Sequence, residues 1–329
     1  MIKINDIVID SRAILAPMAG LTDMPYRIIN RRHGCKFAFT GMISTRGIIS
    51  NCTKTLKMLK TSDEDTPLGI QIMEYNTDFL LPALEKLSEL NHELLDFNAA
   101  CPARKIIRRG AGAALLNEPE KLHRMIKLIV KNSHIPVTLK IRTGWDPATI
   151  NAVDIAKLAQ DSGISALFIH GRTYSQGFSG NIDYNTIYKV NRAVSIPVIG
   201  SGNIFSPYDA KKMISETGCD AVLIARGSYG NPWIFQHIDY FMETGKIAER
   251  TPVQDVANIM AAHFNTMIDF YGEEMAVCLF RKIFVYYTRF FKDIKNLRRK
   301  VFTINDKTRI LDIIKEFESN TARHITQYE

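Results

Sequence analysis

The thiol of Cys101 is a candidate for acid–base chemistry. Cys101 follows Asn98 by three positions and directly precedes Pro102. A free thiol has a pKa of about 8.5, so at neutral pH it is mostly protonated and can donate a proton. We therefore predict that Cys101 is a catalytic acid. For the other cysteines we predict the alternative role of a small hydrophobic residue; these are Cys35, Cys52, Cys219 and Cys278.

Three more side chains are suited to holding a flat, polar ligand. Lys140 alternates with Leu139 and Ile141, so in a strand it points to the opposite face, where a charge is costly to desolvate unless it is paired. We expect Lys140 to meet a ligand, either as a Schiff base or as positive charge beside an electron-rich cofactor. Gln71 and His170 are neutral hydrogen-bonding groups that suit a heterocycle with carbonyl and imino edges. A core histidine is the alternative for His170.

Two glycine-containing segments are candidates for a phosphate site. Residues 200–203 read Gly-Ser-Gly-Asn, and residues 225–228 read Ala-Arg-Gly-Ser. Glycine lets backbone N–H groups approach an anion, and the loops after strands seven and eight of a parallel barrel commonly bind phosphate. Ordinary turn glycines are the alternative, but the two segments together favour a phosphate-bearing ligand. Four basic residues after Cys101 are expected to contact phosphates that flank a target nucleotide: Arg104, Lys105, Arg108 and Arg109.

Composition and residue spacing argue against several classes of protein. With 46% hydrophobic and 23% charged residues, the chain is globular rather than disordered. The candidate residues include no carboxylate pair, which glycoside hydrolysis needs, and the histidines lack HxH or HExxH spacing, so no metal site is expected. Five cysteines without a CxxC pair predict a reducing compartment. Because no apolar stretch approaches the roughly 20 residues that span a bilayer and no secretory signal is recognised, we expect a cytoplasmic protein without membrane contact. We also expect a monomer.

The candidate residues follow a repeated pattern of strand and helix. Eight β-branched or apolar runs begin near positions 12, 37, 67, 94, 136, 166, 197 and 221. Segments with helical spacing of apolar residues lie between them, at 79–90, 119–131, 149–161, 182–192 and 207–217. This α/β alternation predicts a (β/α)8 TIM barrel, in which the candidate residues lie at the C-terminal ends of the strands. An open doubly wound sheet is disfavoured because no GxGxxG motif follows a strand.

The last part of the chain has a different pattern. We predict a barrel domain at 1–242 and an all-helical domain at 243–329, with a loop at 244–252. Residues 281–309 include ten basic and two acidic residues, a net charge of +8 that equals the excess of the whole chain. Arg298, Arg299 and Lys300 lie in this segment, where aromatic residues are interleaved. A solvated helix face is one explanation, and a surface that binds nucleic acid is the other.

The motifs resemble those of the tRNA-dihydrouridine synthases, flavin-dependent enzymes that reduce uridine in the tRNA D-loop. The matching segments are Ala-Pro-Met-Ala-Gly at 16–20, Gln71, Asn-Ala-Ala-Cys-Pro at 98–102, Leu-Lys-Ile-Arg-Thr-Gly-Trp at 139–145, His-Gly-Arg-Thr at 170–173 with Gln176, and Gly-Asn-Pro-Trp-Ile-Phe at 230–235. Together they extend over nearly the whole chain. The resemblance is strongest to the bacterial B-type branch.

This resemblance implies that FMN is bound tightly at the strand ends and that NADPH reduces it. Hydride then passes to C6 of a flipped-out uracil, and Cys101 protonates C5. The implied FMN-binding residues are Pro17, Met18, Ala19, Gln71, Lys140, His170, Ser201, Gly202, Asn203, Ala225 and Arg226. The residues expected to bind tRNA, through its D-loop and elbow, are Asn98, Arg104, Lys105, Arg142, Arg172, Gln176, Arg298, Arg299 and Lys300.

The sequence departs from the family pattern at two places. Ala100 stands where the family usually has Gly before the cysteine, and Ser201-Gly202-Asn203 replaces the common Asn-Gly-Asp. Activity is still expected. Three other functions fit parts of the sequence: an FMN-dependent oxidoreductase of a small molecule, similar to dihydroorotate dehydrogenase; a flavin-free aldolase that uses Lys140; and an RNA-binding protein whose barrel is only a scaffold. The first of these leaves the basic helical segment without a role.

Overall fold

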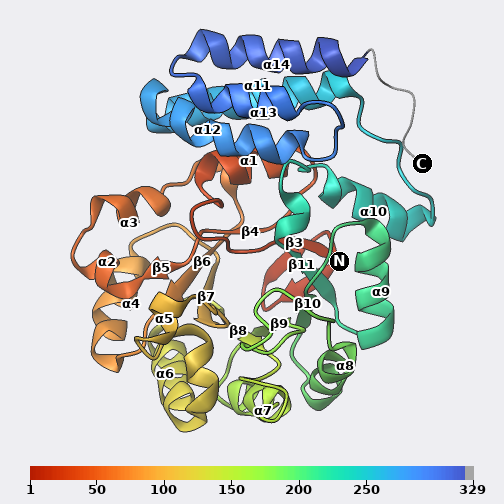
Figure 1. The fold of residues 1–329 in the computed structure, drawn as a ribbon. Coiled ribbons are helices and arrows are strands. Elements are labelled where there is room, and N and C mark those ends of the chain that lie inside the picture. Colours follow the sequence, from red (N-terminus) through yellow and green to blue (C-terminus); the bar gives the residue numbers. More distant parts are fainter. Residues whose placement is uncertain (323–329) are drawn as a thin grey trace.

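Eight parallel strands form the centre of the protein in the computed structural model, which describes residues 1–322. In chain order they are β3 (Ala13–Leu15), β4 (Ala38–Phe39), β6 (Leu68–Met73), β7 (Leu94–Ala99), β8 (Val137–Arg142), β9 (Ala166–His170), β10 (Val198–Ser201) and β11 (Ala221–Ile224). Each strand pairs with the next, and β11 pairs with β3, so the sheet closes into a barrel (Figure 1). The predicted TIM barrel is therefore confirmed.

A helical segment follows each strand on the outside of the barrel. These are α1 (Met24–Arg32), α2 (Thr45–Ile49) with α3 (Thr53–Met58), α4 (Leu80–Ser88), α6 (Pro119–Asn132), α7 (Ala152–Asp161), α8 (Tyr184–Ala193), α9 (Pro207–Thr217) and α10 (Ile234–Thr244). The loops contain β5 (Ile43–Ser44), α5 (Arg104–Ile107), η1 (Asp63–Asp65), η2 (Thr77–Phe79), η3 (Gly112–Asn117) and η4 (Arg226–Ser228). All five helices predicted from periodicity are present. Helix α7 begins later than predicted because the N–H groups of Asn151 and Ala152 bond to the Thr143 carbonyl and form a turn.

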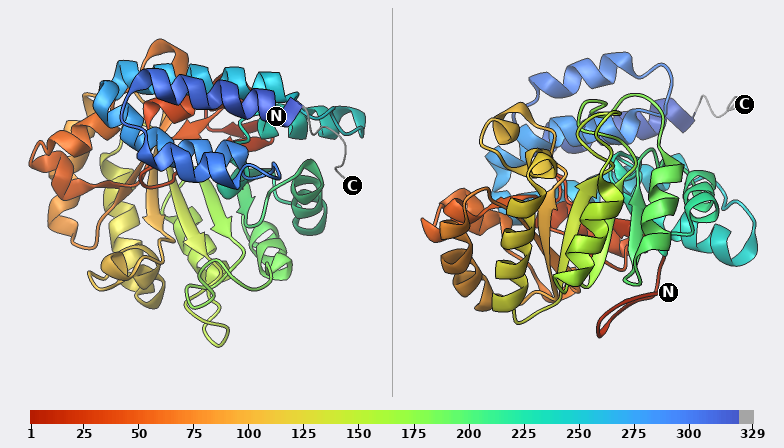
Figure 2. Two further views of the ribbon diagram at one scale, coloured as in Figure 1. Left: turned by 45° about the horizontal axis from the view of Figure 1, so that its top comes forward. Right: turned by 90° about the horizontal axis from the view of Figure 1, so that it is seen from below.

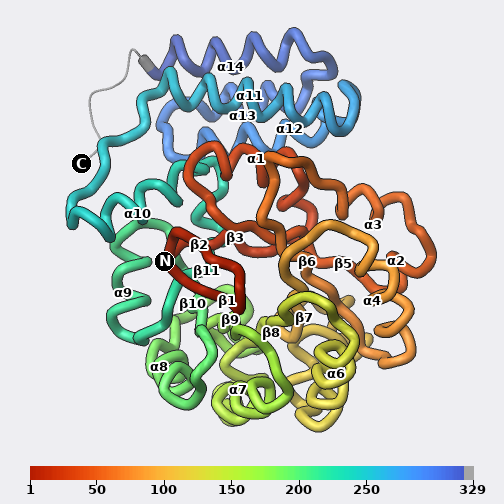
Figure 3. Tube along the Cα trace, turned by 180° about the vertical axis from the view of Figure 1, so that it is seen from behind, coloured from red at the N-terminus to blue at the C-terminus, as the bar shows by residue number. Residues whose placement is uncertain are grey.

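The N-terminus forms a hairpin that was not predicted. Strands β1 (Ile2–Ile4) and β2 (Ile7–Ile9) pair antiparallel, and Asn5 adopts a positive φ of 50° in the turn between them. Ile2, Ile4 and Ile9 are buried in the main hydrophobic cluster. Figure 3 shows the hairpin across the back of the barrel, at the end where β3 begins. It covers the end opposite to the C-terminal ends of the strands.

In the C-terminal region, as far as residue 322, four helices stack on one side of the barrel against α1 (Figures 1 and 2). They are α11 (Val253–Tyr271), α12 (Glu273–Thr288), α13 (Lys295–Lys300) and α14 (Lys307–Ala322), with η5 (Val301–Thr303) between the last two. Buried aromatic residues such as Phe264, Phe280 and Phe317 join the same hydrophobic cluster as the barrel residues. None of the described helices has the length and apolar character needed to cross a membrane. Because the core is continuous, a domain boundary at 242/243 stays a prediction.

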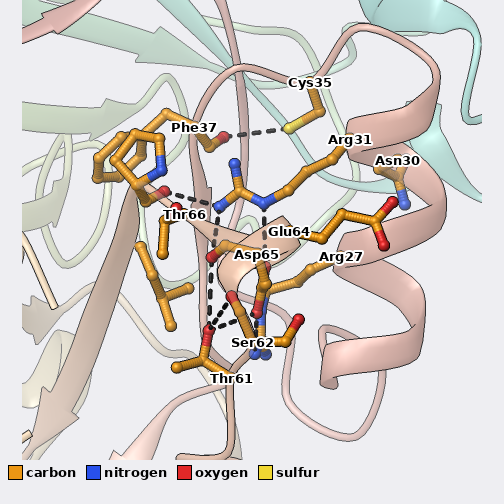
Figure 4. Close-up of polar contacts among 12 residues, drawn as sticks. Arg27, Asn30, Arg31, Cys35, Phe37, Thr61, Ser62, Glu64, Asp65 and Thr66 are labelled. Atoms are coloured by element: carbon orange, nitrogen blue, oxygen red, sulfur yellow. Dashed lines mark hydrogen bonds and ion pairs between the residues drawn. The ribbon is translucent and has the colours of Figure 1, made fainter. Parts of the chain in front are cut away.

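A buried ion-pair cluster holds α1 in place (Figure 4). Both Nε and Nη2 of Arg27 donate to Asp65 Oδ2, at 2.9 and 2.6 Å, and Arg31 Nε donates to Asp65 Oδ1 at 3.0 Å. Arg27 and Asp65 are completely buried. Carbonyl groups of Thr22 and Lys60 accept the remaining hydrogen bonds of Arg27. The cluster fixes the segment before β6 to α1, the helix on which α11 packs.

Candidate active site

A cavity of about 750 Å³ opens at the C-terminal ends of the strands, where TIM barrels carry their active sites. Each of the eight strands, or the segment that follows it, contributes to its lining. The structure brings together here all eleven residues that the resemblance assigned to FMN: Pro17, Met18, Ala19, Gln71, Lys140, His170, Ser201, Gly202, Asn203, Ala225 and Arg226. Asn98, Cys101, Arg104 and Arg142 line the same cavity. Its volume is in the range of sites that bind cofactor-sized molecules.

A chain of hydrogen bonds leads from β8 to Cys101. Thr138 Oγ1 donates to Asp96 Oδ1 at 2.7 Å, and Gln71 Nε2 donates to the other carboxylate oxygen at 2.6 Å. Asn98 Nδ2 donates to Gln71 Oε1 at 2.8 Å. Finally, Asn98 Oδ1 accepts the backbone N–H of Cys101 at 2.9 Å. Every member of this chain is buried or half-buried, and each hydrogen bond has a defined donor and acceptor. The orientation of the Gln71 amide and the position of Cys101 therefore both depend on Asp96.

Lys140 and Asp96 place opposite charges on the neighbouring strands β8 and β7. Burial lowers the pKa of Lys140 to about 8; Asp96 opposes this effect and Arg142 adds to it. Burial also raises the pKa of Asp96 to about 6, against its hydrogen bonds from Gln71 and Thr138. Both groups are therefore mainly charged at neutral pH. Within the described residues Lys140 makes no hydrogen bond, so its ammonium group is free to bind a ligand in the cavity.

His170 is a neutral group in a positively charged environment. Burial lowers the pKa of His170 far below its usual range, and four cations strengthen the effect: Arg142, Lys140, Arg172 and Arg226. Its Nδ1 atom is buried and has no hydrogen-bond partner in the described structure. The Phe178 ring contacts the imidazole edge-on, with 6.4 Å between ring centroids. An unpaired imidazole nitrogen beside the cavity fits a ligand-binding role better than that of a satisfied core histidine.

The loops after β10 and β11 form a backbone cradle. Gly202 has a φ of +131° and Asn203 one of +53°, conformations that turn the chain sharply after β10. At Gly227 an added Cβ would come within 2.1 Å of the Ile204 carbonyl oxygen, so the two loops approach as closely as glycine permits. Arg226 Nη2 donates to Asn203 Oδ1 at 3.2 Å and links them. Cavity-lining backbone and a guanidinium group in this arrangement suit a phosphate.

The structure shows what the two departures from the family pattern do. Ala100 lines the cavity, and its carbonyl oxygen accepts Arg142 Nε at 2.7 Å. The Ser201 hydroxyl donates to the Ile169 carbonyl at 3.1 Å and therefore ties β10 to β9. Asn203 supplies the amide oxygen for Arg226. Both departures are accommodated without closing the cavity.

Cys101 lies half-buried at the end of β7, next to a buried guanidinium group. Burial raises the pKa of the Cys101 thiol, while the backbone N–H of Ala103 and the charge of Arg142 act in the opposite direction. Arg142 is held by three carbonyl groups, those of Ala100, Thr173 and Gly177, at 2.7, 2.9 and 2.8 Å. Arg142 thus joins the loops after β7 and β9. The thiol stays protonated at neutral pH, as an acid requires.

Other residues expected to bind tRNA lie outside the cavity lining. Arg172 donates through Nε and Nη2 to the Gly180 carbonyl, and Gln176 Oε1 accepts the Thr173 N–H, so both shape the loop after β9. Lys105 lies on the short helix α5, beside Arg104. Arg172 is buried, and none of these three side chains lines the cavity.

The basic triplet of α13 divides into three different environments. The guanidinium group of Arg298 donates to Thr288 and to the Phe291 carbonyl, and so holds the end of α12. Lys300 Nζ pairs with Glu316 on α14 at 2.5 Å. Arg299 is exposed. The net charge of this segment therefore overstates the number of cations that face solvent without a partner.

Residues that line or support the site were also missed by sequence reasoning. Asp96 shares a strand face with Asn98, and this alternation was a signal that could have identified it. Phe178, Phe205 and Tyr229 line the cavity from loops, where periodicity gives no signal. Phe178 is 59% exposed and lies over the guanidinium groups of Arg142 and Arg226.

Comparison with known proteins gives a consistent result. The family model described as Dihydrouridine synthase (Dus) matches residues 14–323. A protein named tRNA-dihydrouridine synthase B from Pseudomonas aeruginosa is 40% identical over 86% of this chain and 85% of that protein. One of the same name from Vibrio vulnificus is 35% identical over 97% of this chain and 99% of its own length.

A solved structure, histamine dehydrogenase from Rhizobium sp. 4-9, has a TM-score of 0.56 at 12% identity. The match covers 80% of this chain and 50% of that one, and it supports the fold alone. The family model and the relatives, in contrast, extend over most of the sequence, including the residues around the cavity. The chain belongs to the dihydrouridine synthase family.

Proposed function

We propose that this protein is a cytoplasmic tRNA-dihydrouridine synthase that uses FMN and NADPH to reduce the C5=C6 bond of uridine in the tRNA D-loop. The observation that carries the proposal is one cavity that combines a protonated thiol, a free ammonium group and a glycine cradle. Family membership favours this reaction over a dihydroorotate dehydrogenase-like oxidation or an aldolase reaction.

The residues around the cavity fit FMN. Ser201–Asn203 and Ala225–Arg226 would hold the phosphate, since Gly202 and Gly227 let these loops pack closely beside the cavity and Arg226 carries the complementary charge. Pro17, Met18 and Ala19 offer a mainly apolar wall for one ring face. Lys140 and Gln71 present an ammonium group and an amide to the polar ring edge. When bound, reduced FMN supplies the hydride for C6 of uracil.

Cys101 would supply the proton for C5. Its thiol lines the cavity, and Asn98 fixes its backbone through the Cys101 N–H. Since burial raises the pKa of the thiol, the acid form persists through the neutral range. Arg142, held by three carbonyl groups, places a positive charge near the sulfur and stabilises the thiolate that remains after proton transfer.

The substrate base must leave its stack to reach this cavity. Unstacking costs a few kcal/mol, which contacts with phosphate groups and aromatic rings offset. Arg104 and the exposed Phe178 both line the cavity and offer a cation and an aromatic ring to such a nucleotide. The exposed basic residues of the C-terminal helices, Arg299 among them, would bind the rest of the tRNA.

Conversion of a tRNA transcript tests this function. Purified protein loaded with FMN is incubated with NADPH and an unmodified tRNA, and the nucleosides are analysed by mass spectrometry. We expect dihydrouridine at D-loop positions and none when NADPH is omitted. Oxidation of dihydroorotate by the same preparation, without dihydrouridine formation, would instead support the small-molecule alternative.

A further inference from the structure

The loop that carries Arg226 is held by a residue of the C-terminal helices. Arg289, directly after α12, donates from Nη1 and Nη2 to the Arg226 carbonyl oxygen, both at 3.3 Å. Arg289 is partly buried, and burial lowers the pKa of its guanidinium group. The two N–H groups share one carbonyl oxygen and so restrain the peptide between Arg226 and Gly227. Both residues of that peptide line the cavity.

The same helix supports the next turn of the loop. Gly230 has a φ of +58°, and an added Cβ there would lie 2.3 Å from backbone atoms of Tyr286 and Tyr287. The rings of Tyr229 and Tyr286 stack with 4.6 Å between centroids and an angle of 22°. Tyr229 also lines the cavity. The backbone of α12 is therefore in contact with the loop of residues 225–230, which lines part of the cavity.

The barrel side of this loop is held by α1. Tyr26 donates its hydroxyl to the Ser228 carbonyl at 2.9 Å, and Ser228 Oγ donates to the Ala225 carbonyl at 2.8 Å. His263 of α11 packs against Tyr26 and hydrogen-bonds the Tyr287 hydroxyl at 3.2 Å. The loop is thus clamped between α1 and α12 over residues 225–230.

We propose that α12 is a structural part of the cofactor site, with Arg289 as a positioning residue that orients the Arg226–Gly227 peptide toward the ligand phosphate. This inference rests on the proposed function, because it requires FMN with its phosphate in the glycine cradle. It adds a second role to the C-terminal helices, which act on the cofactor as well as on RNA.

Binding of FMN and of riboflavin to the full-length apoprotein, without tRNA, tests the proposal. Riboflavin lacks the phosphate, so it reports on the cavity without the cradle. We expect Arg289→Ala to weaken FMN binding about 10-fold, with riboflavin binding changed less than twofold, because one charge-assisted contact to the cradle is lost. Arg289→Lys keeps the charge but not the two N–H groups that share the Arg226 carbonyl, and its FMN affinity should lie between those of Arg289→Ala and the wild type.

Arg281→Ala is the matched control. Arg281 lies on the same helix and donates through Nε and Nη2 to the Ile304 carbonyl, at 3.2 and 2.8 Å, away from the cavity. We expect thermal stability to fall in both alanine variants but FMN affinity to fall only at Arg289. Unchanged FMN affinity in Arg289→Ala, an equal loss for riboflavin, or the same phosphate-specific loss in Arg281→Ala would overturn the proposal. A wild-type protein that binds no FMN would instead overturn the proposed function.

Discussion

The barrel rim and the C-terminal helices carry similar charged side chains, but the environments of these side chains differ. At the rim, Lys140 is half-buried and Arg142 is buried, and desolvation lowers their pKa values to about 8 and about 10. In the helical region, Arg281 of α12 donates to the Ile304 carbonyl, Arg298 of α13 donates to the Phe291 carbonyl before its own helix, and Arg299 faces solvent. A charged side chain that is buried beside a cavity can take part in chemistry. The net charge of a segment indicates only the sign of the potential at its surface.

The largest effect should come from the thiol at the rim. Cys101→Ala is expected to lower turnover by about 10²–10⁴-fold, the usual contribution of a general acid, while FMN and tRNA affinities stay near the wild-type values. Single-turnover measurements of dihydrouridine formation check the rate, and separate titrations check both affinities. Cys278→Ala is the matched control, because Cys278 is an exposed thiol of the helical region. Undiminished turnover in Cys101→Ala would reject the role of Cys101 as acid.

A smaller effect is expected at the buried ammonium group. Lys140→Met should weaken FMN binding by about 10–100-fold, because a charge-assisted contact in a desolvated site is lost. The wild-type affinity should decline as pH rises above about 8, since Lys140 then loses its proton and its charge. The variant should lack this decline. Fluorescence titrations of FMN between pH 7 and about 9 check both statements; a variant with the wild-type pH profile would contradict them.

The smallest effects are expected at Arg298 and Arg299, two neighbouring residues of the helical region with different environments. Arg299→Ala should weaken tRNA binding a few-fold and lower the slope of log affinity against log salt by about one, with unchanged thermal stability. Arg298→Ala should instead lower the free energy of unfolding by about 1–3 kcal/mol, because carbonyl acceptors at the end of α12 lose their donor. Melting curves and salt-dependent binding measured on both variants separate the two roles. If both variants changed only tRNA affinity, the assignment of Arg298 to the helix end would be wrong.

Much of the barrel and its rim could be predicted because the fold imposes a simple rule. Strand ends in a parallel barrel meet at one edge, so Gln71, Lys140 and His170 were expected together although they are far apart in sequence. The spacing of apolar residues sufficed for five helices. The structure adds the Ser206 capping box and the left-handed Gly218 at the two ends of α9.

Long-range contacts could not be predicted in the same way. The bonds from Arg289 to Arg226 and from Arg298 to Thr288 depend on how α12 and α13 pack, and composition assigned these residues only to a charged surface. Asp96 was missed because a single carboxylate inside an apolar run does not reveal its partners. The N-terminal hairpin was missed because its strands are only three residues long.

The flavin content of the purified protein tests the central claim most directly. The absorbance spectrum is recorded after purification and again after incubation with excess FMN followed by gel filtration. The account predicts a flavin band in the protein fraction, at close to one FMN per chain after loading. A protein that is colourless on purification and stays colourless after incubation would contradict it.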